Sequence, residues 1–346
     1  MPGSGDTTEG ARMETRQLGR SGPAVSRFAF GTMTFGGDTD EAAAHEMLDA
    51  YVEAGGTLID TADIYGSGAS ERIVGRWLSA RPGVRERVLI ATKGRFGFPG
   101  ASLTPAYLRT ALDAGLARLG VDQVDLYQVH GPDDEHRVDE IVEFLAEIVA
   151  AGKARHVGVS NFAGWQVAKL ARLLAERGGP PLVSQQIQYS LLARAVEWEV
   201  VPAGVDAGVG TLLYGPLGQG WLTGKYRRDQ RPPVGTRVAR AEDMTSEAWH
   251  RRNTEEVWSV IEVLRDVAHA HGVTPGQAAL AWAADRPGVT APIVGARTVA
   301  QLRESLAAAA LHLGEEANTR LTEASTPLTP NYPYGMLERI AGWHGE

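Results

Sequence analysis

The sequence has 346 residues, a hydrophobic share of 43% and a formal net charge of −8 at pH 7. This length suits an α/β barrel with insertions, and the acidic balance argues against nucleic acid as a partner, because phosphate binding requires a basic face. The absence of cysteine excludes disulfide bonds, a cysteine nucleophile and thiolate metal sites, and it fits a reducing cytoplasm.

The N-terminal stretch is small and polar, and we expect residues 1–15 to form a flexible leader. This stretch lacks the apolar core of a secretory signal. No apolar run in the chain reaches the roughly 20 residues that a membrane-spanning helix needs. The sequence therefore predicts a soluble, cytoplasmic protein with no membrane partner.

Short β-rich runs alternate with longer helical patterns from about residue 28 to residue 310. The expected strands are Phe28–Thr32, Thr57–Thr61, Val88–Lys93, Leu126–His130, His156–Ser160, Ser184–Tyr189, Gly210–Tyr214 and Ala291–Gly295. The expected helices include Asp40–Glu53, Ala69–Leu78, Thr104–Leu119, Val138–Ala151, Gly164–Glu176 and Asn253–His271. Strands separated by helices imply parallel pairing with right-handed crossovers. Eight strands favour a closed (β/α)8 TIM barrel, an α/β fold, over an open sheet, although the number of strands does not decide between the two.

We assign residues 16–325 to a single barrel domain. Within it, Thr104-Pro105 and Thr274-Pro275 have the form of an N-cap followed by proline at the first helical position. Residues 226–252 are rich in charge and proline, and we interpret them as a surface insertion after the seventh strand. The irregular tail, residues 326–346, is expected to pack on the barrel or to line its pocket.

Polar side chains collect where the expected strands end, which is where barrel enzymes keep their chemistry. Asp60 ends the second strand and leads to Tyr65, Lys93 ends the third strand, and His130 ends the fourth. Taken singly, each has an ordinary structural explanation as a cap, a lining aromatic, a solvated lysine or a hydrogen-bonded histidine. Together, a carboxylate, a phenol, an ammonium and an imidazole at one face of one barrel favour a catalytic group.

The chain resembles the aldo-keto reductase family in segments that occur in order from about Arg16 to Leu313. These segments are Gly31–Gly36, Ile59–Gly66, Ala91–Lys93, Asp125–His130, Gly158–Phe162, Gln186–Leu192, Pro216–Tyr226 and Gly295–Arg297. The insertion after the seventh strand is typical of a bacterial branch that also resembles aryl-alcohol dehydrogenases and potassium-channel β subunits.

The resemblance implies a catalytic tetrad of Asp60, Tyr65, Lys93 and His130. Hydride addition to a carbonyl builds negative charge on oxygen, so a proton donor must stand beside that oxygen. A phenol has an ordinary pKa of about 10, and a neighbouring ammonium makes it a better donor. Asp60 would hold Lys93 and keep it charged, while His130 would hydrogen-bond the carbonyl oxygen.

No Gly-x-Gly-x-x-Gly follows the first strand, which argues against a Rossmann domain, and Thr223-Gly224-Lys225 lacks the flanking residues of a phosphate loop. We expect phosphate to be held by the loops after strands seven and eight. The resemblance implies NADPH/NADP+ as cofactor, with Arg297 and Gln301 at the adenosine 2′-phosphate. The alternative is that Arg297 is a solvated residue at a helix start.

The resemblance also implies which residues contact the cofactor. The full set is Gly31, Thr32, Met33, Asp60, Ser160, Asn161, Gln186, Tyr214, Pro216, Leu217, Gly218, Lys225, Gly295, Ala296, Arg297, Gln301 and Ser305. Gly215, Val294 and Ser305 depart from residues common in the family, and these changes would weaken cofactor affinity.

The expected substrate pocket is mostly apolar. Its residues are Phe35, Tyr65, Phe96, Phe98 and His130. This wall favours an aldehyde, a ketone or a quinone-like carbonyl and disfavours a strongly anionic substrate. The main alternative function is a nucleotide-binding regulatory or redox-sensing subunit with little turnover. A metal-dependent hydrolase is disfavoured, and no metal site is expected, because no second histidine or carboxylate accompanies His130 on its strand. The sequence leaves a homo-oligomer open.

Overall fold

A computed structural model describes residues 13–97, 102–133, 138–240 and 248–341 of the chain. Eight parallel strands close into a barrel in the order β10-β3-β4-β5-β6-β7-β8-β9. Their bounds are β3 Ala29–Gly31, β4 Leu58–Asp60, β5 Leu89–Gly94, β6 Val124–Val129, β7 Ala154–Ser160, β8 Leu182–Gln188, β9 Gly210–Tyr214 and β10 Val289–Gly295. The predicted TIM barrel is therefore confirmed, and each predicted strand overlaps an observed one.

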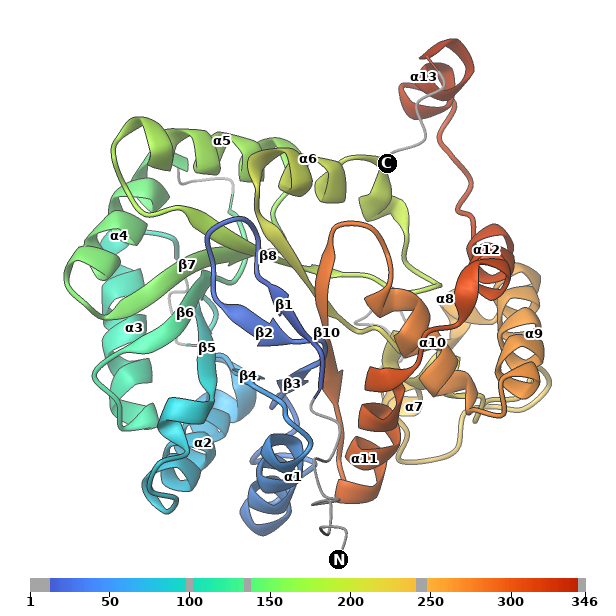
Figure 1. The fold of residues 1–346 in the computed structure, drawn as a ribbon, viewed down its shortest axis with the longest axis horizontal. Coiled ribbons are helices and arrows are strands. Elements are labelled where there is room, and N and C mark those ends of the chain that lie inside the picture. Colours follow the sequence, from blue (N-terminus) through green and yellow to red (C-terminus); the bar gives the residue numbers. More distant parts are fainter. Residues whose placement is uncertain (1–12, 98–101, 134–137, 241–247, 342–346) are drawn as a thin grey trace, which may run out of the picture.

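Helices surround the barrel on its outside, as Figure 1 shows. The longer ones are α1 Glu41–Glu53, α2 Ala69–Ser79, α3 Pro105–Leu119, α4 Val138–Ala150, α5 Gly164–Glu176, α6 Val200–Ala207, α9 Glu255–Ala270, α10 Pro275–Ala284, α11 Val299–Ala307, α12 Gly314–Ala324 and α13 Tyr334–Ala341. Short 3-10 turns are η1 Tyr65–Gly68, η2 Arg85–Arg87, η3 Ala195–Trp198, η4 Gly218–Thr223 and η5 Ala308–Ala310. Within the described residues, none of these helices combines the length and the apolar character that a bilayer crossing requires.

Local sequence explains where several helices begin. The hydroxyl of Thr104 accepts a hydrogen bond from the backbone N–H of Tyr107 at the start of α3. Thr274 and Gln277 form a reciprocal capping box at the start of α10, and a proline follows each of these two threonines. Such caps satisfy N–H groups that have no partner inside the helix. The two helix starts predicted from Thr-Pro are thus confirmed.

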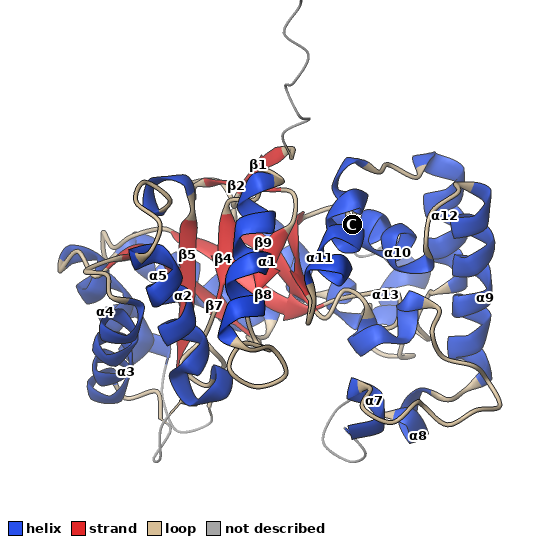
Figure 2. Cartoon of the chain, turned by 90° about the horizontal axis from the view of Figure 1, so that it is seen from below, coloured by secondary structure: helices blue, strands red, loops and turns tan. Residues whose placement is uncertain are grey.

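A short hairpin, β1 Thr15–Gln17 with β2 Ala24–Ser26, closes the N-terminal end of the barrel. The sequence did not indicate this hairpin. Figure 2 shows it at one end of the barrel, with α7 Arg237–Arg240 and α8 Trp249–Arg252 at the opposite end. Because the parallel strands run away from the hairpin, the carboxyl ends of the strands open toward the side of α7 and α8.

Residues 13–15, at the end of the expected leader, are described in the structure. Met13 is buried and Thr15 pairs with Ser26 in the hairpin. Residues 1–12 lie outside the described part of the chain. Residues 13–15 therefore belong to the fold, because the side chain of Met13 is buried and the backbone of Thr15 pairs in the hairpin.

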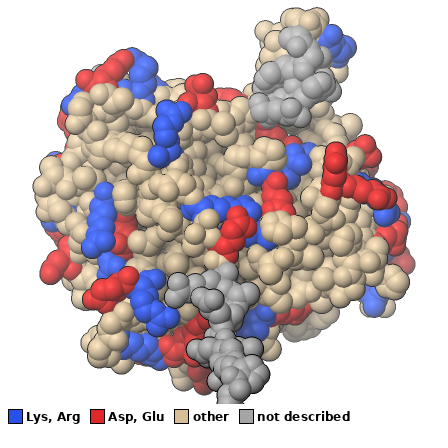
Figure 3. Space-filling model, in the orientation of Figure 1, with Lys and Arg blue, Asp and Glu red and all other residues tan. Residues whose placement is uncertain are grey.

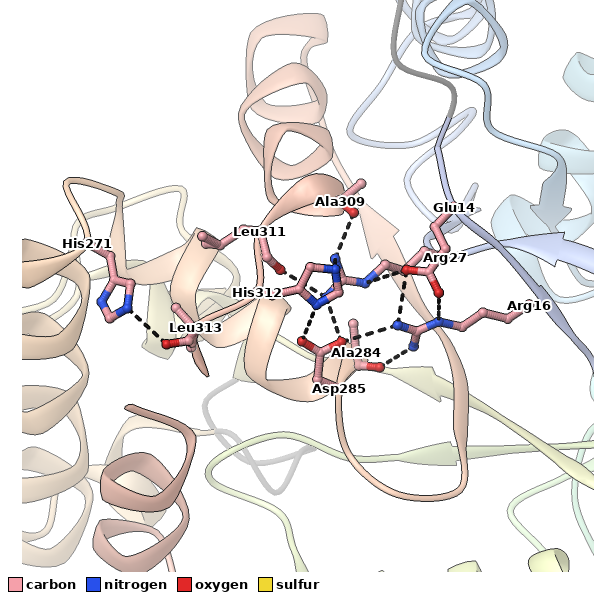
Figure 4. A network of polar contacts seen from close by, with 10 residues as sticks. All are labelled: Glu14, Arg16, Arg27, His271, Ala284, Asp285, Ala309, Leu311, His312 and Leu313. Carbon is pink, nitrogen blue, oxygen red and sulfur yellow. Dashed lines mark hydrogen bonds and ion pairs between the residues drawn. The ribbon is translucent and has the colours of Figure 1, made fainter. Parts of the chain in front are cut away.

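A polar network ties the hairpin to the outer helices (Figure 4). The guanidinium of Arg27, fully buried, lies 2.7 Å from a carboxylate oxygen of Asp285 and donates to backbone oxygens of Ala309 and Leu311. His312 reaches the other carboxylate oxygen of Asp285 at 2.9 Å. Figure 3 views this same face and shows acidic and basic side chains interspersed over it. The charged groups of this network are paired with one another, so we assign the network to the stability of the closed end of the barrel.

The insertion after β9 is anchored by aromatic packing. The ring of Trp249 on α8 stacks on that of Trp221 in η4, with ring centroids 5.0 Å apart and planes 14° apart. Trp258 meets Trp221 edge-on at 5.7 Å, and Val238 on α7 is fully buried. The described part of the predicted insertion lies on the surface, with most of residues 227–237 exposed. Trp249 and Val238 anchor it to the fold through aromatic and aliphatic contacts.

Helix α13 contacts the segment after β8 through Tyr334, while Leu328 and Tyr332 in the tail before it are largely exposed. Tyr334 on α13 stacks on Trp198 of η3 with centroids 5.5 Å apart, and its hydroxyl lies 3.3 Å from a carboxylate oxygen of Glu199. Figure 1 shows α13 at the periphery of the molecule.

Candidate active site

Three neighbouring strands bring the predicted tetrad together. Asp60 is the last residue of β4, Lys93 lies near the end of β5, and His130 directly follows β6. Asp60 pairs in register with Ala91, and Lys93 pairs with Gln128. Tyr65 opens η1, four residues beyond Thr61. Since adjacent parallel strands end at one face, all four side chains gather at the open mouth of the barrel.

Asp60 and Lys93 form a buried ion pair. The ammonium of Lys93 lies 2.7 Å from Oδ2 of Asp60, with the two side chains 0% and 3% exposed. The same ammonium donates to the backbone oxygen of Thr61 at 2.7 Å, while the amide of Gln186 donates to Oδ1 of Asp60 at 2.8 Å. Burial lowers the pKa of Lys93, but Asp60 and Tyr65 together raise it above its ordinary value. The lysine is therefore charged at neutral pH.

The phenol of Tyr65 stands above this pair. The ammonium of Lys93 is 5.0 Å from the centroid of the Tyr65 ring. Burial raises the pKa of Tyr65, and the charge of Lys93 and a hydrogen bond from it partly offset that rise. The pKa of Tyr65 is raised on balance, so the phenol keeps its proton at neutral pH. The ammonium of Lys93 lies close enough to stabilise the phenolate.

The imidazole of His130 is neutral. Burial, with the positive charges of Lys93 and Arg95, lowers the pKa of His130 to about 3. Its ring meets Tyr65 edge-on, with centroids 6.2 Å apart, and its buried Nδ1 has no hydrogen-bond partner among the described residues. A neutral imidazole can donate one hydrogen bond to a bound oxygen.

The aromatic residues expected in the pocket wall differ in their exposure. The ring of Phe96, 37% exposed, packs against His130 with centroids 5.2 Å apart. Phe35 differs from the expectation, since it is fully buried against Phe30 and belongs to the core rather than to an open wall. Its strand-end position carried no information about which way the chain turns. Phe98 lies outside the described residues.

Amide and hydroxyl groups from β7, β8 and β9 line the side of the mouth next to the tetrad. The amide of Asn161 donates to the backbone oxygen of His130 at 3.0 Å and to the hydroxyl of Ser160 at 3.1 Å. The hydroxyl of Tyr214 donates to Oδ1 of Asn161 at 2.8 Å. Asn161 holds a left-handed backbone, φ 63°, to make these contacts. Such groups suit a neutral amide as a ligand.

A turn rich in left-handed residues follows β9. Gly218, Gln219 and Gly220 have φ of 54°, 53° and 100°. A Cβ on Gly220 would lie 2.5 Å from the ammonium of Lys225, so the glycine makes room for that lysine. Successive residues of this kind can turn their N–H groups toward an anion. Pro216 before this turn is buried and Leu217 is half-buried.

Two cations flank the ends of β9 and β10. Burial, and then the positive charge of Arg297, lower the pKa of Lys225. Arg297 donates to the backbone oxygen of Gly235 in the insertion at 3.2 Å, and its backbone N–H donates to Gln301 at 3.0 Å. Like charges in proximity favour an anion between them, which fits the phosphates of a dinucleotide. Exposed Gly295, buried Ala296 and half-buried Ser305 border these groups in sequence.

Of the two residues that follow β3, Thr32 is buried and Met33 is exposed. Thr32 is fully buried, and its hydroxyl contacts Ser70 at 2.7 Å and the backbone oxygen of Asp60 at 3.0 Å. Thr32 thus braces β4 from beneath the mouth. Met33 is 41% exposed, and its sulfur lies 3.6 Å from the guanidinium of Arg237. A Cβ on Gly31 would lie 2.8 Å from Ile293, so this position needs glycine.

Sequence reasoning missed Ser70 and Arg237. Ser70 joins Thr32 and Thr61 by hydrogen bonds, and Arg237 reaches Met33 from the insertion. The Ser70–Thr32 and Arg237–Met33 contacts link residues 38 and 204 positions apart, so no local spacing could have found them. Among the described residues, no group of three or more histidine, aspartate or glutamate side chains is arranged to hold a metal ion.

A barrel with a buried lysine–aspartate pair, a phenol and a neutral imidazole at its mouth holds the groups that proton transfer to a carbonyl oxygen requires. The family model described as "Aldo/keto reductase family" matches residues 27–326. The chain therefore belongs to the aldo/keto reductase family, whose members carry out NAD(P)H-dependent carbonyl reduction.

Three relatives cover nearly the whole chain. The chain is 38% identical over 318 residues to the uncharacterized oxidoreductase YrpG of Bacillus subtilis, covering 88% of this chain and 93% of that protein. It is 30% identical over 341 residues to the aldo-keto reductase yakc [NADP(+)] of Schizosaccharomyces pombe, covering 94% and 96%. It is 33% identical over 307 residues to the human aflatoxin B1 aldehyde reductase member 2, covering 85% of each.

Proposed function

We propose that this protein is an NADPH-dependent reductase of aldehydes and ketones in which Tyr65 donates the proton. The observation that carries the proposal is the ion pair of Lys93 and Asp60, with side chains 0% and 3% exposed, directly beside the Tyr65 ring. A buried pair of this kind is costly to build. Because the pair lies next to the protonated phenol of Tyr65, the charge of Lys93 would stabilise the phenolate that forms when Tyr65 gives up its proton.

The residues of the mouth would each perform a separate task. When bound, the nicotinamide supplies a hydride. Tyr65 would hold its proton at the phenolic oxygen and release it to the carbonyl oxygen, and Lys93 would stabilise the resulting phenolate. Neutral His130 would donate a second hydrogen bond to the same oxygen and fix its orientation.

The residues present fit a dinucleotide with an extra phosphate. Ser160, Asn161 and Gln186 would hold the carboxamide, and Tyr214 would stack on the ring beside Asn161. The turn after Leu217 and the cations Lys225 and Arg297 would hold the phosphates. The printed name of the yakc relative, with NADP(+), supports the same choice.

A matched pair of variants tests the proton donor. NADPH oxidation is followed at saturating cofactor with a panel of aromatic and aliphatic aldehydes. Tyr65→Phe should lower kcat by about 10² to 10⁴-fold, the usual contribution of a positioned acid, while binding of NADPH persists. Tyr107→Phe, a change of the same atom on α3, should keep wild-type rates. Retention of most activity by Tyr65→Phe contradicts the assignment.

The cofactor choice has its own test. Arg297→Ala should raise the KM for NADPH about tenfold or more with a smaller effect on NADH, because a charge-assisted contact to the 2′-phosphate is lost. Arg303→Ala, an exposed arginine further along α11, is the control. An equal effect on both cofactors would refute NADPH preference. If the wild-type protein binds NADPH but reduces no member of the panel, it is a nucleotide-binding regulatory subunit instead.

A further inference from the structure

Arg95 is held in an unusual backbone conformation at the mouth of the barrel. It follows β5 and has φ of 153°, a value that L residues rarely adopt. The carboxylate of Asp63, buried in the β4–η1 connection, accepts from the backbone N–H of Arg95 at 3.2 Å and from that of Gly97 at 3.1 Å. Strain of this kind persists where the surroundings impose it, and it concentrates at functional sites.

The side chain of Arg95 points its charge into the same region. Its guanidinium carbon lies 4.5 Å from the centroid of the Phe96 ring. A Cβ on Gly131 would lie 3.0 Å from its Nη1, so the glycine leaves room for the group. The Nε of Arg95 is buried and lacks a hydrogen-bond partner, and across the described ranges of the chain no carboxylate forms an ion pair with this guanidinium.

Arg95 stands next to the residues proposed to hold the carbonyl. Its charge is one of the causes that lower the pKa of His130, and the ring of Phe96 bridges the two residues. A second guanidinium reaches the mouth from the insertion, since Arg237 lies 3.6 Å from the sulfur of Met33. The positive charge of Arg237 is also one of the causes that lower the pKa of Tyr65 against the effect of burial. Cations therefore approach the tetrad from two directions.

The barrel order separates Arg95 from the cations proposed to hold cofactor phosphates. Lys225 and Arg297 follow β9 and β10, while Arg95 follows β5. In the closed order, β5 lies opposite β9, with β6, β7 and β8 between them on one side and β4, β3 and β10 on the other. An anion on Arg95 would thus sit on the substrate side of the mouth.

We propose that Arg95 is an anion-binding, specificity-determining residue, and that the substrates are aldehydes or ketones that carry a carboxylate. A planar guanidinium suits bidentate binding of a carboxylate, and the contact with the Phe96 ring holds the guanidinium beside His130. Arg237 adds positive potential from the far side. This inference rests on the proposed reductase function and names its substrate class, and it revises the expectation of an apolar pocket that disfavours anionic substrates.

The test uses two substrates that differ only in charge. The wild-type protein with NADPH is assayed on 4-carboxybenzaldehyde and on its methyl ester. We expect kcat/KM for the acid to exceed that for the ester by at least about tenfold. Arg95→Gln should lower this acid-to-ester ratio at least about tenfold, Arg95→Lys should give a smaller loss, and Arg303→Gln, the same charge change on α11, should leave the ratio unchanged. The ratio in the wild type should also fall as KCl is raised.

Several outcomes overturn the inference. A wild-type ratio near one does so, as does a ratio that Arg95→Gln does not change. A rise in the KM for NADPH in Arg95→Gln with an unchanged ratio would assign Arg95 to the cofactor. Binding of 4-(hydroxymethyl)benzoate in the presence of NADP+, measured by calorimetry, separates this inference from the proposed function. If no carbonyl is reduced, the proposed function fails, whereas weaker binding to Arg95→Gln still supports the anion site and equal binding contradicts it.

Discussion

Removing the charge of Lys93 should destabilise the fold as well as abolish reduction. In Lys93→Met, the carboxylate of Asp60, only 3% exposed, loses the ammonium that lies 2.7 Å away. Breaking a buried ion pair from one side typically costs about 3–5 kcal/mol, because an uncompensated charge remains in the interior. The amide of Gln186 still donates to Asp60 at 2.8 Å, so we expect the lower end of that range.

A double-mutant cycle isolates the pair. Asp60→Asn should also destabilise, since Lys93 would then be the unpaired charge. The double variant Asp60→Asn with Lys93→Met removes both charges and should be more stable than Lys93→Met alone, although it remains inactive. The exposed pair of Lys153 and Asp113 is the control, and Lys153→Met should cost within about 1 kcal/mol.

The measurement is the free energy of unfolding from urea titrations, followed by circular dichroism, for wild type, the single variants and the double variant. A loss below about 1 kcal/mol in Lys93→Met would refute the reasoning, because it would mean that Asp60 is not held as a buried carboxylate. A double variant that is no more stable than Lys93→Met would refute it as well.

Three further predictions concern pH, the insertion and the closed end of the barrel. Burial and nearby cations lower the pKa of His130 to about 3, so below about pH 6.5 the unfolded chain binds a proton at this residue that the folded chain does not. The free energy of unfolding should therefore fall by up to about 2 kcal/mol between pH 7 and pH 5. In urea titrations at the two pH values, His130→Gln should remove that part of the pH dependence. Trp249→Ala removes the ring stacked on Trp221, and we expect a higher KM for NADPH and a free energy of unfolding lower by about 2–3 kcal/mol. An unchanged KM would show that the insertion plays no part in cofactor binding. Arg27→Met removes one ion-pair partner of Asp285 at the end of the barrel remote from the mouth. The free energy of unfolding should fall by about 2 kcal/mol while kcat/KM stays at the wild-type value. A change in kcat/KM would contradict the separation of the two ends of the barrel.

The sequence predicted the barrel because its signals are local. Strand 210–214 was predicted with its observed bounds, and Thr104 and Thr274 cap helices as their Thr-Pro pairs indicated. The hairpin before β3 was missed, because Thr15–Gln17 and Ala24–Ser26 lack the continuous apolar run that marks a strand buried on both faces. Phe35 was misplaced for a related reason, since the turn after β3 takes its direction from packing against Phe30.

The sequence by itself determined which chemical groups stand at the ends of β4, β5 and β6, because parallel strands of a closed barrel carry their terminal residues to one face. Asp60, Lys93 and His130 were found in this way. Only the tertiary structure decided how the mouth is charged. The strained turn at Arg95 depends on a carboxylate 32 residues away, and Arg237 arrives from an insertion 204 residues beyond Met33. Contacts at such separations are set by packing of the whole chain, and no local pattern encodes them.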